Sequence, residues 1–150
     1  MSISVIQWTT GHVGREAVKG ILRHPELELV GCYAWSDSKV GQDVGTLCGL
    51  APAGISASGD IDALLAMDAD CVCYMPTFPD IEEVERILAS GKNVVSSYFI
   101  NARSWGTDVQ SRLQKAAEAG NVSLFGSGIF PGFANFVAAI MAQASYGFKK

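Results

Sequence analysis

Two kinds of apolar pattern alternate along this chain, and their alternation restricts its possible folds more than any other feature. Short runs of strand type occupy residues 3–8, 27–34, 55–57, 70–75, 93–96 and 122–125. Segments with apolar residues at helical spacing occupy residues 13–22, 60–66, 81–88, 105–116 and 133–144. Because no short hairpin turn joins the strand-type runs, we expect parallel strands connected by right-handed helical crossovers. The pattern predicts an α/β fold, a doubly wound parallel sheet of about six strands with helices on both faces.

The composition limits both the number of domains and the possible partners. With 150 residues, of which 49% are hydrophobic, the chain has enough apolar surface for one well-buried domain. Charged residues make up only 17% and the formal net charge is −4, which argues against a nucleic-acid or acidic-membrane surface. The N-terminus lacks the pattern of a signal peptide, and no apolar run approaches the roughly 20 residues needed to span a bilayer. We therefore expect a soluble, cytoplasmic protein with no nucleic-acid or membrane partner.

The four cysteines show no spacing typical of a zinc site or a disulfide framework. Cys71 and Cys73 stand two positions apart in an apolar run, so they would share one face of a strand. We interpret all four, Cys32 and Cys48 included, as buried structural thiols, and we expect no metal site.

The segment after the first strand, VIQWTTGHVGREAVKGI at residues 5–21, has glycines where a doubly wound fold binds its ligand. Read as G-x-G-x-x-G, it supplies Gly11 and Gly14 but has Thr9 in place of the first glycine. Read as G-x-x-G-x-x-[GA], it is complete with Gly11, Gly14 and Ala17. We adopt the second frame, which predicts that Thr9→Gly changes little. Glycines here would let the backbone approach a phosphate bound by the N–H groups of the helix start, although an ordinary strand-turn-helix remains the alternative.

This G-x-x-G-R-x-[GA] loop after an N-terminal first strand resembles that of the dihydrodipicolinate reductase family and its relatives, such as 2,4-diaminopentanoate dehydrogenase. Three further segments are similar to family segments: an apolar strand and T-x-P loop at residues 70–79, a G-x-x-V-V segment at 91–97, and a G-x-G-x-x-P-G-F segment at 126–133. The sequence departs from the family where Ser96-Ser97-Tyr98 replaces G-T-T-G. Together the matches cover nearly the whole chain.

The resemblance implies that residues 1–150 are a Rossmann-type, NAD(P)-binding domain of an oxidoreductase that reduces C=N bonds or oxidatively deaminates amines. For His12 and Arg15, contact with the phosphates and a solvated surface position both stay open. NADP is the expected cofactor rather than NAD, because Ser36 and Lys39 follow the second strand where an acidic residue would grip a free ribose hydroxyl. An ordinary polar loop is the alternative there. The candidate cofactor-binding residues are Thr9, Thr10, Gly11, His12, Val13, Gly14, Arg15, Ser36, Lys39, Pro76, Thr77, Phe78, Ser97 and Gly128, and we expect Trp8 and Trp35 near them.

The sequence predicts no catalytic residue. In the resembled reductases the substrate-binding residues belong to a second domain, so we expect a substrate and oligomerisation domain to be absent from this chain and the isolated chain to be inactive. Two other functions stay open: a dinucleotide-binding or redox-sensing module without catalysis, and a Rossmann-like binder of CoA or another nucleotide. The apolar segment 133–144 predicts an interface, either with a missing C-terminal catalytic domain or with a second copy in a homo-oligomer.

Overall fold

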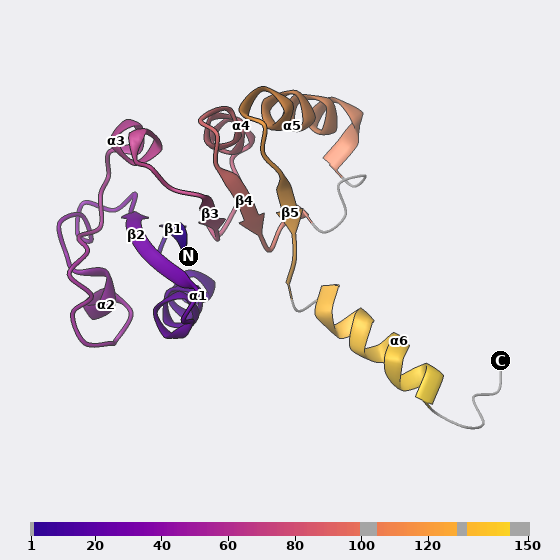
Figure 1. The fold of residues 1–150 in the computed structure, drawn as a ribbon, viewed down its shortest axis with the longest axis horizontal. Coiled ribbons are helices and arrows are strands. Elements are labelled where there is room, and N and C mark those ends of the chain that lie inside the picture. Colours follow the sequence, from indigo (N-terminus) through magenta and orange to yellow (C-terminus); the bar gives the residue numbers. More distant parts are fainter. Residues whose placement is uncertain (1, 100–104, 129–131, 145–150) are drawn as a thin grey trace.

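The computed structural model describes residues 2–99, 105–128 and 132–144. Its strands form one parallel sheet in the order β2-β1-β3-β4-β5, with helices on both faces (Figure 1). The strands are β1 (Ile3–Trp8), β2 (Leu27–Tyr33), β3 (Cys71–Tyr74), β4 (Asn93–Ser96) and β5 (Leu124–Gly126). The helices are α1 (His12–Arg23), α2 (Val44–Leu47), α3 (Ile61–Ala66), α4 (Ile81–Ala89), α5 (Gly106–Gly120) and α6 (Ala134–Ala144). The expected Rossmann-type α/β class is confirmed, with five strands among the described residues.

The segment of residues 55–57 does not form the sixth strand that its apolar pattern predicts. Ser56 makes an isolated antiparallel bridge with Asp43, and Ser58 makes an isolated parallel bridge with Tyr33. Ala57 instead exchanges backbone hydrogen bonds with the loop before α2: its N–H donates to the Gln42 carbonyl at 2.9 Å, and its carbonyl accepts from the Gly41 N–H at 2.8 Å. The segment therefore borders the sheet without extending it.

The glycine-rich stretch of residues 41–54, expected as a loop, contains the short helix α2. Asp43 caps this helix, because its side chain accepts a hydrogen bond of 3.0 Å from the Thr46 N–H. The same carboxylate accepts from the N–H groups of Ala53 at 3.0 Å and Gly54 at 2.8 Å. One side chain thus joins both ends of a stretch that would otherwise be a long structureless loop.

The two faces of the sheet bury separate apolar clusters. On one face, Ile6, Val72 and Val94 pack with the inner side chains of α3, α4 and α5. On the other, Val5 and Leu29 pack with those of α1 and α2. Figure 1 shows α4 and α5 side by side on one face and α1 on the other. Strand β1 lies between β2 and β3 and contributes to both clusters, which explains why most of its residues are apolar.

One row of side chains across the sheet shows where the second face is incomplete. Gln7 of β1 is paired with Cys73 of β3, Cys73 with Val95 of β4, and Val95 with Phe125 of β5. Paired residues of parallel strands point to the same face. Gln7 is fully buried, Cys73 and Val95 are half-buried, and Phe125 is 62% exposed. Helix α1 therefore covers β1 and β2 but leaves the β5 end of this face open.

Helix α6 extends away from the layers of the sheet (Figure 1). None of its residues is buried, and Phe136 and Ile140 are 63% and 50% exposed. The predicted helix and its apolar character are confirmed, and its role as an interface stays a prediction. Among the described residues, no helix is both long enough and apolar enough to cross a membrane.

A glycine allows α4 and α5 to approach each other closely. A Cβ added at Gly120 would lie 1.9 Å from the carbonyl oxygen of Leu88. Gly120 is the last residue of α5, and Asn121, with φ of 53°, adopts the left-handed conformation that ends the helix. The glycine is needed for packing and the asparagine for termination.

Candidate functional site

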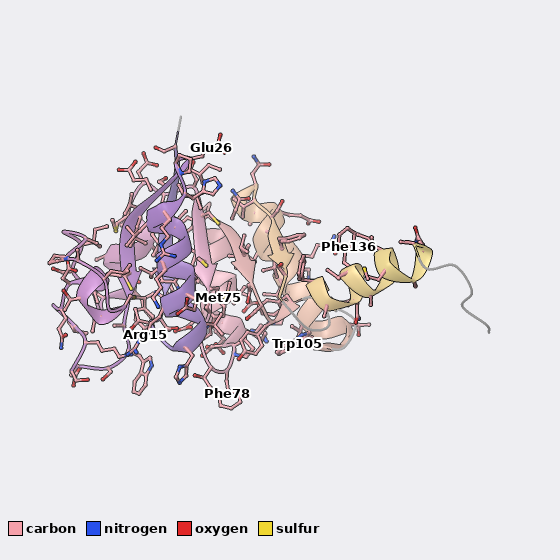
Figure 2. All side chains as sticks on the ribbon, turned by 90° about the horizontal axis from the view of Figure 1, so that it is seen from below. Arg15, Glu26, Met75, Phe78, Trp105 and Phe136 are labelled. Carbon is pink, nitrogen blue, oxygen red and sulfur yellow. The ribbon has the colours of Figure 1, made fainter. Side chains whose placement is uncertain are left out.

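A cleft at the carboxyl ends of β1, β2 and β3 collects many of the residues that the sequence predicts to bind a cofactor. Its volume is about 430 Å³. Figure 2 shows Phe78 at this end of the molecule and Glu26, which precedes β2, at the opposite end. In a doubly wound sheet, ligands bind at this edge beside the first strand. The lining residues are Thr9, Thr10, Gly11, Tyr33, Ala34, Trp35, Lys39, Pro76, Thr77, Phe78, Asp80 and Glu83.

The turn between β1 and α1 corrects the frame that we adopted from the sequence. Thr9 has φ of 73°, in the left-handed region where a β-branched residue is strained. In G-x-G-x-x-G loops, the first glycine makes this tight turn. Thr9 therefore stands at the first-glycine position, and the frame built on Gly11, Gly14 and Ala17 is wrong. The sequence did not reveal this because the residue type at position 9 does not indicate the sign of φ. In the structure, contacts of Thr9 with β2 and with the residue after β3 set that sign.

Gly11 and Gly14 fit the second and third positions of the same frame. A Cβ at Gly11 would meet nothing within 4 Å, so a ligand can approach the backbone there. A Cβ at Gly14 would lie 2.3 Å from the carbonyl oxygen of Thr9. Gly14 is buried and lies outside the cleft lining, so it allows α1 to pack closely against the turn.

The start of α1 presents unpaired N–H groups close to the cleft. Its N-cap is Gly11, and no side chain caps the helix. The first-turn N–H groups lack partners inside a helix and carry the positive end of its dipole, which favours an anion. The side chains of His12, Val13 and Arg15 are exposed around this helix start, and none of them lines the cleft. Their contact with a phosphate stays a prediction.

The loop after β2 brings a cation to the cleft. Lys39 Nζ donates hydrogen bonds to the carbonyl oxygen of Thr10 at 3.3 Å and to its Oγ1 at 3.2 Å. Ser36 Oγ lies 2.7 Å from Ser38 Oγ, and Ser36 is not among the lining residues. Trp35 lines the cleft and is 75% exposed, as expected from its place beside the candidate site.

A hydrogen-bond network fixes the wall that follows β3. Trp8 Nε1 and the Tyr74 hydroxyl both donate to Oε2 of Glu83, at 3.2 and 2.9 Å. The same hydroxyl accepts from the Asp80 N–H at 2.9 Å. Burial is the main cause that raises the pKa of Tyr74 well above its usual range, so the hydroxyl remains a donor at neutral pH. The network ties the first turn of α4 to the sheet and orients the carboxylate of Glu83 at the cleft.

Ser97 and Gly128 follow β4 and β5, at the same edge of the sheet, but neither lines the cleft. The Ser127 N–H donates to the Ser96 carbonyl at 2.7 Å, which extends the pairing of the two strands by one step. Gly128 has φ of 146°, a conformation that L side chains rarely adopt. Residues 129–131 of the expected G-x-G-x-x-P-G-F segment lie outside the described residues.

Sequence reasoning missed four residues that line the cleft, namely Tyr33, Ala34, Asp80 and Glu83. Tyr33 is the last residue of β2, and Asp80 and Glu83 lie three apart at the start of α4. A position at a strand end or in the first turn of the following helix was the available signal. These two acids place negative charge on the β3 side of the cleft, opposite in sign to Lys39.

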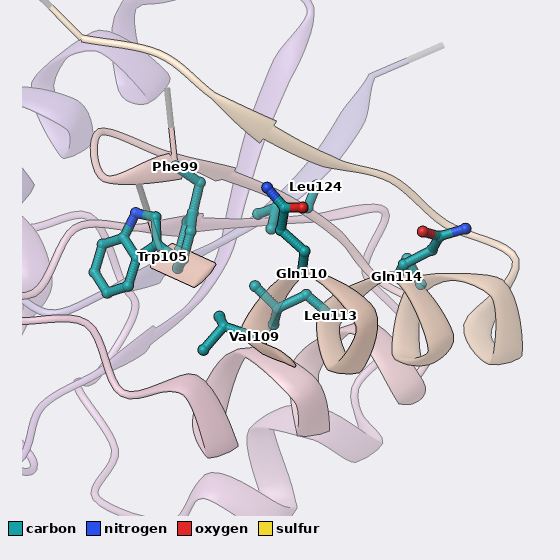
Figure 3. A pocket seen from close by; sticks show the side chains of 8 residues that line it. Phe99, Trp105, Val109, Gln110, Leu113, Gln114 and Leu124 are labelled. Atoms are coloured by element: carbon teal, nitrogen blue, oxygen red, sulfur yellow. The ribbon is translucent and has the colours of Figure 1, made fainter. Parts of the chain in front are cut away.

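A second cavity of about 500 Å³ lies between α5 and β5 (Figure 3). It is lined mainly by apolar side chains, with the amides of Gln110 and Gln114 as polar groups and no charged residue. Phe99 and Trp105 line it from the two sides of residues 100–104, which the structure does not describe. Its lining residues include no cation to balance the charge of an anionic cofactor, in contrast to the first cleft.

The four cysteines are free thiols. Cys32 and Cys48 are buried as expected, whereas Cys71 and Cys73 are half-buried. Burial raises the pKa of Cys32 and of Cys73 to about 12, so these thiols stay neutral and poorly nucleophilic at physiological pH. The part of the chain that the structure describes holds no group of histidine, cysteine or acidic side chains suited to a metal ion.

The fold and the first cleft together define a class, a Rossmann-type dinucleotide-binding domain. A tight turn, an open glycine and a free helix start meet at the carboxyl end of the first strand, as this class requires.

Residues 2–97 match the family model described as dihydrodipicolinate reductase, N-terminus, and the chain belongs to this family. An amine dehydrogenase from Streptomyces virginiae is 33% identical over 148 residues, covering 93% of this chain and 41% of that protein. A 4-hydroxy-tetrahydrodipicolinate reductase from Synechococcus elongatus is 28% identical over 147 residues, covering 93% of this chain and 51% of that protein. The chain therefore spans about half the length of these relatives or less, and it is similar to their NAD(P)-binding oxidoreductase domain.

Solved structures agree on the fold. The amine dehydrogenase from Mycobacterium smegmatis superposes with a TM-score of 0.76 at 24% identity, covering 85% of this chain and 40% of that one. The WlbA dehydrogenase from Bordetella pertussis, in complex with NADH and UDP-GlcNAcA, has a TM-score of 0.62 at 20% identity, covering 83% of this chain and 34% of that one. At these identities the likeness extends to the fold alone.

Proposed function

We propose that this chain binds a nicotinamide dinucleotide at the cleft beside β1, as the cofactor domain of an oxidoreductase acting on C=N or amine substrates. The observation that carries the proposal is the Thr9 turn followed by the unobstructed Gly11 and the uncapped start of α1. A pyrophosphate needs backbone N–H groups that it can approach without a Cβ in the way. The family relatives, an amine dehydrogenase and a dihydrodipicolinate-type reductase, support the reaction class.

In this proposal the adenosine half of the cofactor lies between the loops after β2 and β3. Trp35 and Phe78 are 75% and 82% exposed and line the cleft from these two loops. Large exposed aromatic side chains at a cleft offer a base a stacking surface. Lys39, whose Nζ is hydrogen-bonded to Thr10, is the one cation among the described residues that line the cleft and would meet the 2′-phosphate of NADP. We therefore propose NADP in preference to NAD.

The cofactor would supply the hydride, and this chain would bind and orient it. No residue of this chain is assigned a catalytic role in the proposal. The chain spans about half the length of these relatives or less. We therefore expect the chain by itself to bind cofactor without turnover.

Titration of the chain with NADPH, NADH and CoA tests the proposal. We expect binding of NADPH and weaker binding of NADH in calorimetry, together with quenching of tryptophan fluorescence. Trp35→Leu should weaken binding and remove most of the quenching, whereas Trp105→Leu, at the second cavity, should leave the dissociation constant unchanged. Binding of CoA alone would replace the proposal with a different nucleotide ligand, and no binding of any of the three would reject it.

A further inference from the structure

Thr9 adopts a glycine-like conformation, and three hydrogen bonds hold it there. Its N–H donates to the Tyr33 carbonyl at the end of β2, at 3.0 Å. Its hydroxyl donates to the Met75 carbonyl just after β3, also at 3.0 Å. Its own carbonyl oxygen accepts from Gln7 Nε2 at 2.9 Å. A strained backbone conformation persists only where several surrounding contacts fix it. Here the contacts come from β1, from the end of β2 and from the residue that follows β3.

Gln7 is an unusual residue for its position in the core. Its side chain is fully buried, and besides Thr9 its Nε2 contacts the Trp8 carbonyl oxygen at 3.2 Å. Its Oε1 is buried with no partner among the described residues. Turning the amide round would set its oxygen against two carbonyl oxygens, so the donor must face the turn. An apolar side chain would fill this space without an orphaned oxygen, so the specific contribution of glutamine is the Nε2 donor.

We propose that Gln7 and Thr9 form a clamp that takes the place of the missing first glycine and preorganises the cofactor turn. Gln7 is a positioning residue, because it holds the Thr9 carbonyl in the space that Gly14 leaves free. The Thr9 hydroxyl ties the same turn to Met75, next to the Pro76–Phe78 wall of the cleft. Thr9 thereby links the turn after β1 to the loop after β3, and both segments line the cleft. The inference rests on the proposed function only where it concerns cofactor affinity.

A double-mutant cycle tests the clamp. Gln7→Met keeps the volume of the side chain and removes the donor, and we expect it to weaken NADPH binding by about tenfold. Glycine adopts the left-handed conformation without strain, so Thr9→Gly removes the need for the donor. In the Thr9→Gly background, Gln7→Met should therefore change NADPH affinity by less than about twofold. An equal loss of affinity in both backgrounds would show that Gln7 merely fills the core and would overturn the clamp.

Two further measurements separate failure of the clamp from failure of the proposed function. Amide hydrogen exchange of residues 10–14 in the free chain should accelerate on Gln7→Met, and it should accelerate less in the Thr9→Gly background. This pattern supports the clamp even if no dinucleotide binds, whereas unchanged exchange in every variant refutes it. Val5→Ala, on the same strand and face, is the control: it should lower the unfolding free energy while leaving NADPH affinity and the Gln7 coupling unchanged.

Discussion

The two ends of the sheet differ in how completely their side chains are covered. At the β1 and β2 end, helices lie on both faces, and Gln7 and Trp8 of β1 are fully buried. At the β5 end one face is open, with Phe125 62% exposed, and the following helix α6 has no buried residue. The Thr9 turn thus lies at the covered end of the sheet. The β5 end presents exposed apolar surface, which is typical of an interface.

From this difference we expect the two ends to have separate tasks. A site that must hold an anion in fixed geometry requires a rigid support, which the covered end provides through the Thr9 and Glu83 hydrogen bonds. An end that docks onto another protein surface must keep apolar side chains accessible until docking occurs. Substitutions at one end should therefore leave the property of the other end unchanged.

The largest effect is expected at the covered end, from Gly14→Val. Its Cβ would lie 2.3 Å from the Thr9 carbonyl oxygen, so the turn must move. We expect NADPH affinity to fall by more than about 100-fold and the unfolding free energy to fall by about 3 kcal/mol. Calorimetry and urea unfolding measure the two quantities. Gly20→Ala, in the same helix but with nothing within 4 Å of its Cβ, should leave both near or above their original values. Wild-type affinity in Gly14→Val would refute binding at this turn.

The next effect belongs to the open end. Replacing Phe136 and Ile140, which share a face of α6, with glutamine should reduce self-association of the chain by about 100-fold, because each apolar side chain contributes roughly 1.5 to 3 kcal/mol when buried. Sedimentation velocity over a range of concentrations measures the association. Leucine at both positions is the apolar control and should preserve it. Cofactor affinity should be the same in all three proteins, and a strictly monomeric wild type at high concentration would contradict self-association through α6.

A smaller and more selective effect is expected from Lys39→Glu. The reversed charge should weaken NADPH binding by about tenfold and NADH binding by no more than about twofold, because NADPH alone carries the 2′-phosphate. Parallel titrations at low and moderate salt would report it, and the difference should shrink as salt increases. Lys115→Glu, on the exposed surface of α5, makes the same change in net charge and should affect neither cofactor. An equal loss for both cofactors in Lys39→Glu would remove the argument for NADP.

The smallest effect concerns the Asp43 carboxylate, which ties residues 53 and 54 to α2 on the covered end. Backbone hydrogen bonds, first from Thr46 and then from Ala53, lower the pKa of Asp43 below its usual value of 3.8. A lowered pKa adds stability that is present above the unfolded-state value and is lost as the pH falls through the folded-state value. The unfolding free energy should thus fall below about pH 4 in wild type, and Asp43→Asn should reduce that dependence. Asp37→Asn, in an exposed loop, is the control, and an identical pH profile for Asp43→Asn would exclude this role.

Much of this molecule could be predicted from local patterns. The apolar runs located the five strands found among the described residues, because a strand between two helical layers is mostly apolar. Helical spacing located α1, α3, α4, α5 and α6. The glycines after β1 located the cleft, because parallel connections bring the carboxyl ends of the strands to one edge. Lys39 was expected in the cleft because it follows the second strand, and Pro76 and Phe78 because their segment resembles the T-x-P loop of the family.

The sequence by itself therefore determined the class of fold, the edge that carries the site and the apolar character of α6, since each follows from the order and period of residue types. Only the tertiary structure decided that residues 55–57 join no strand, that Glu83 faces the cleft, and that Thr9 takes the place of a glycine. These outcomes depend on hydrogen bonds between segments far apart in the chain, such as Thr9 with Tyr33 and Met75. The φ angle of Thr9 is set by contacts with distant segments, and the types of the neighbouring residues do not reveal it. The residue types at positions 9 to 14 are therefore compatible with two glycine frames, whereas the structure is compatible with one.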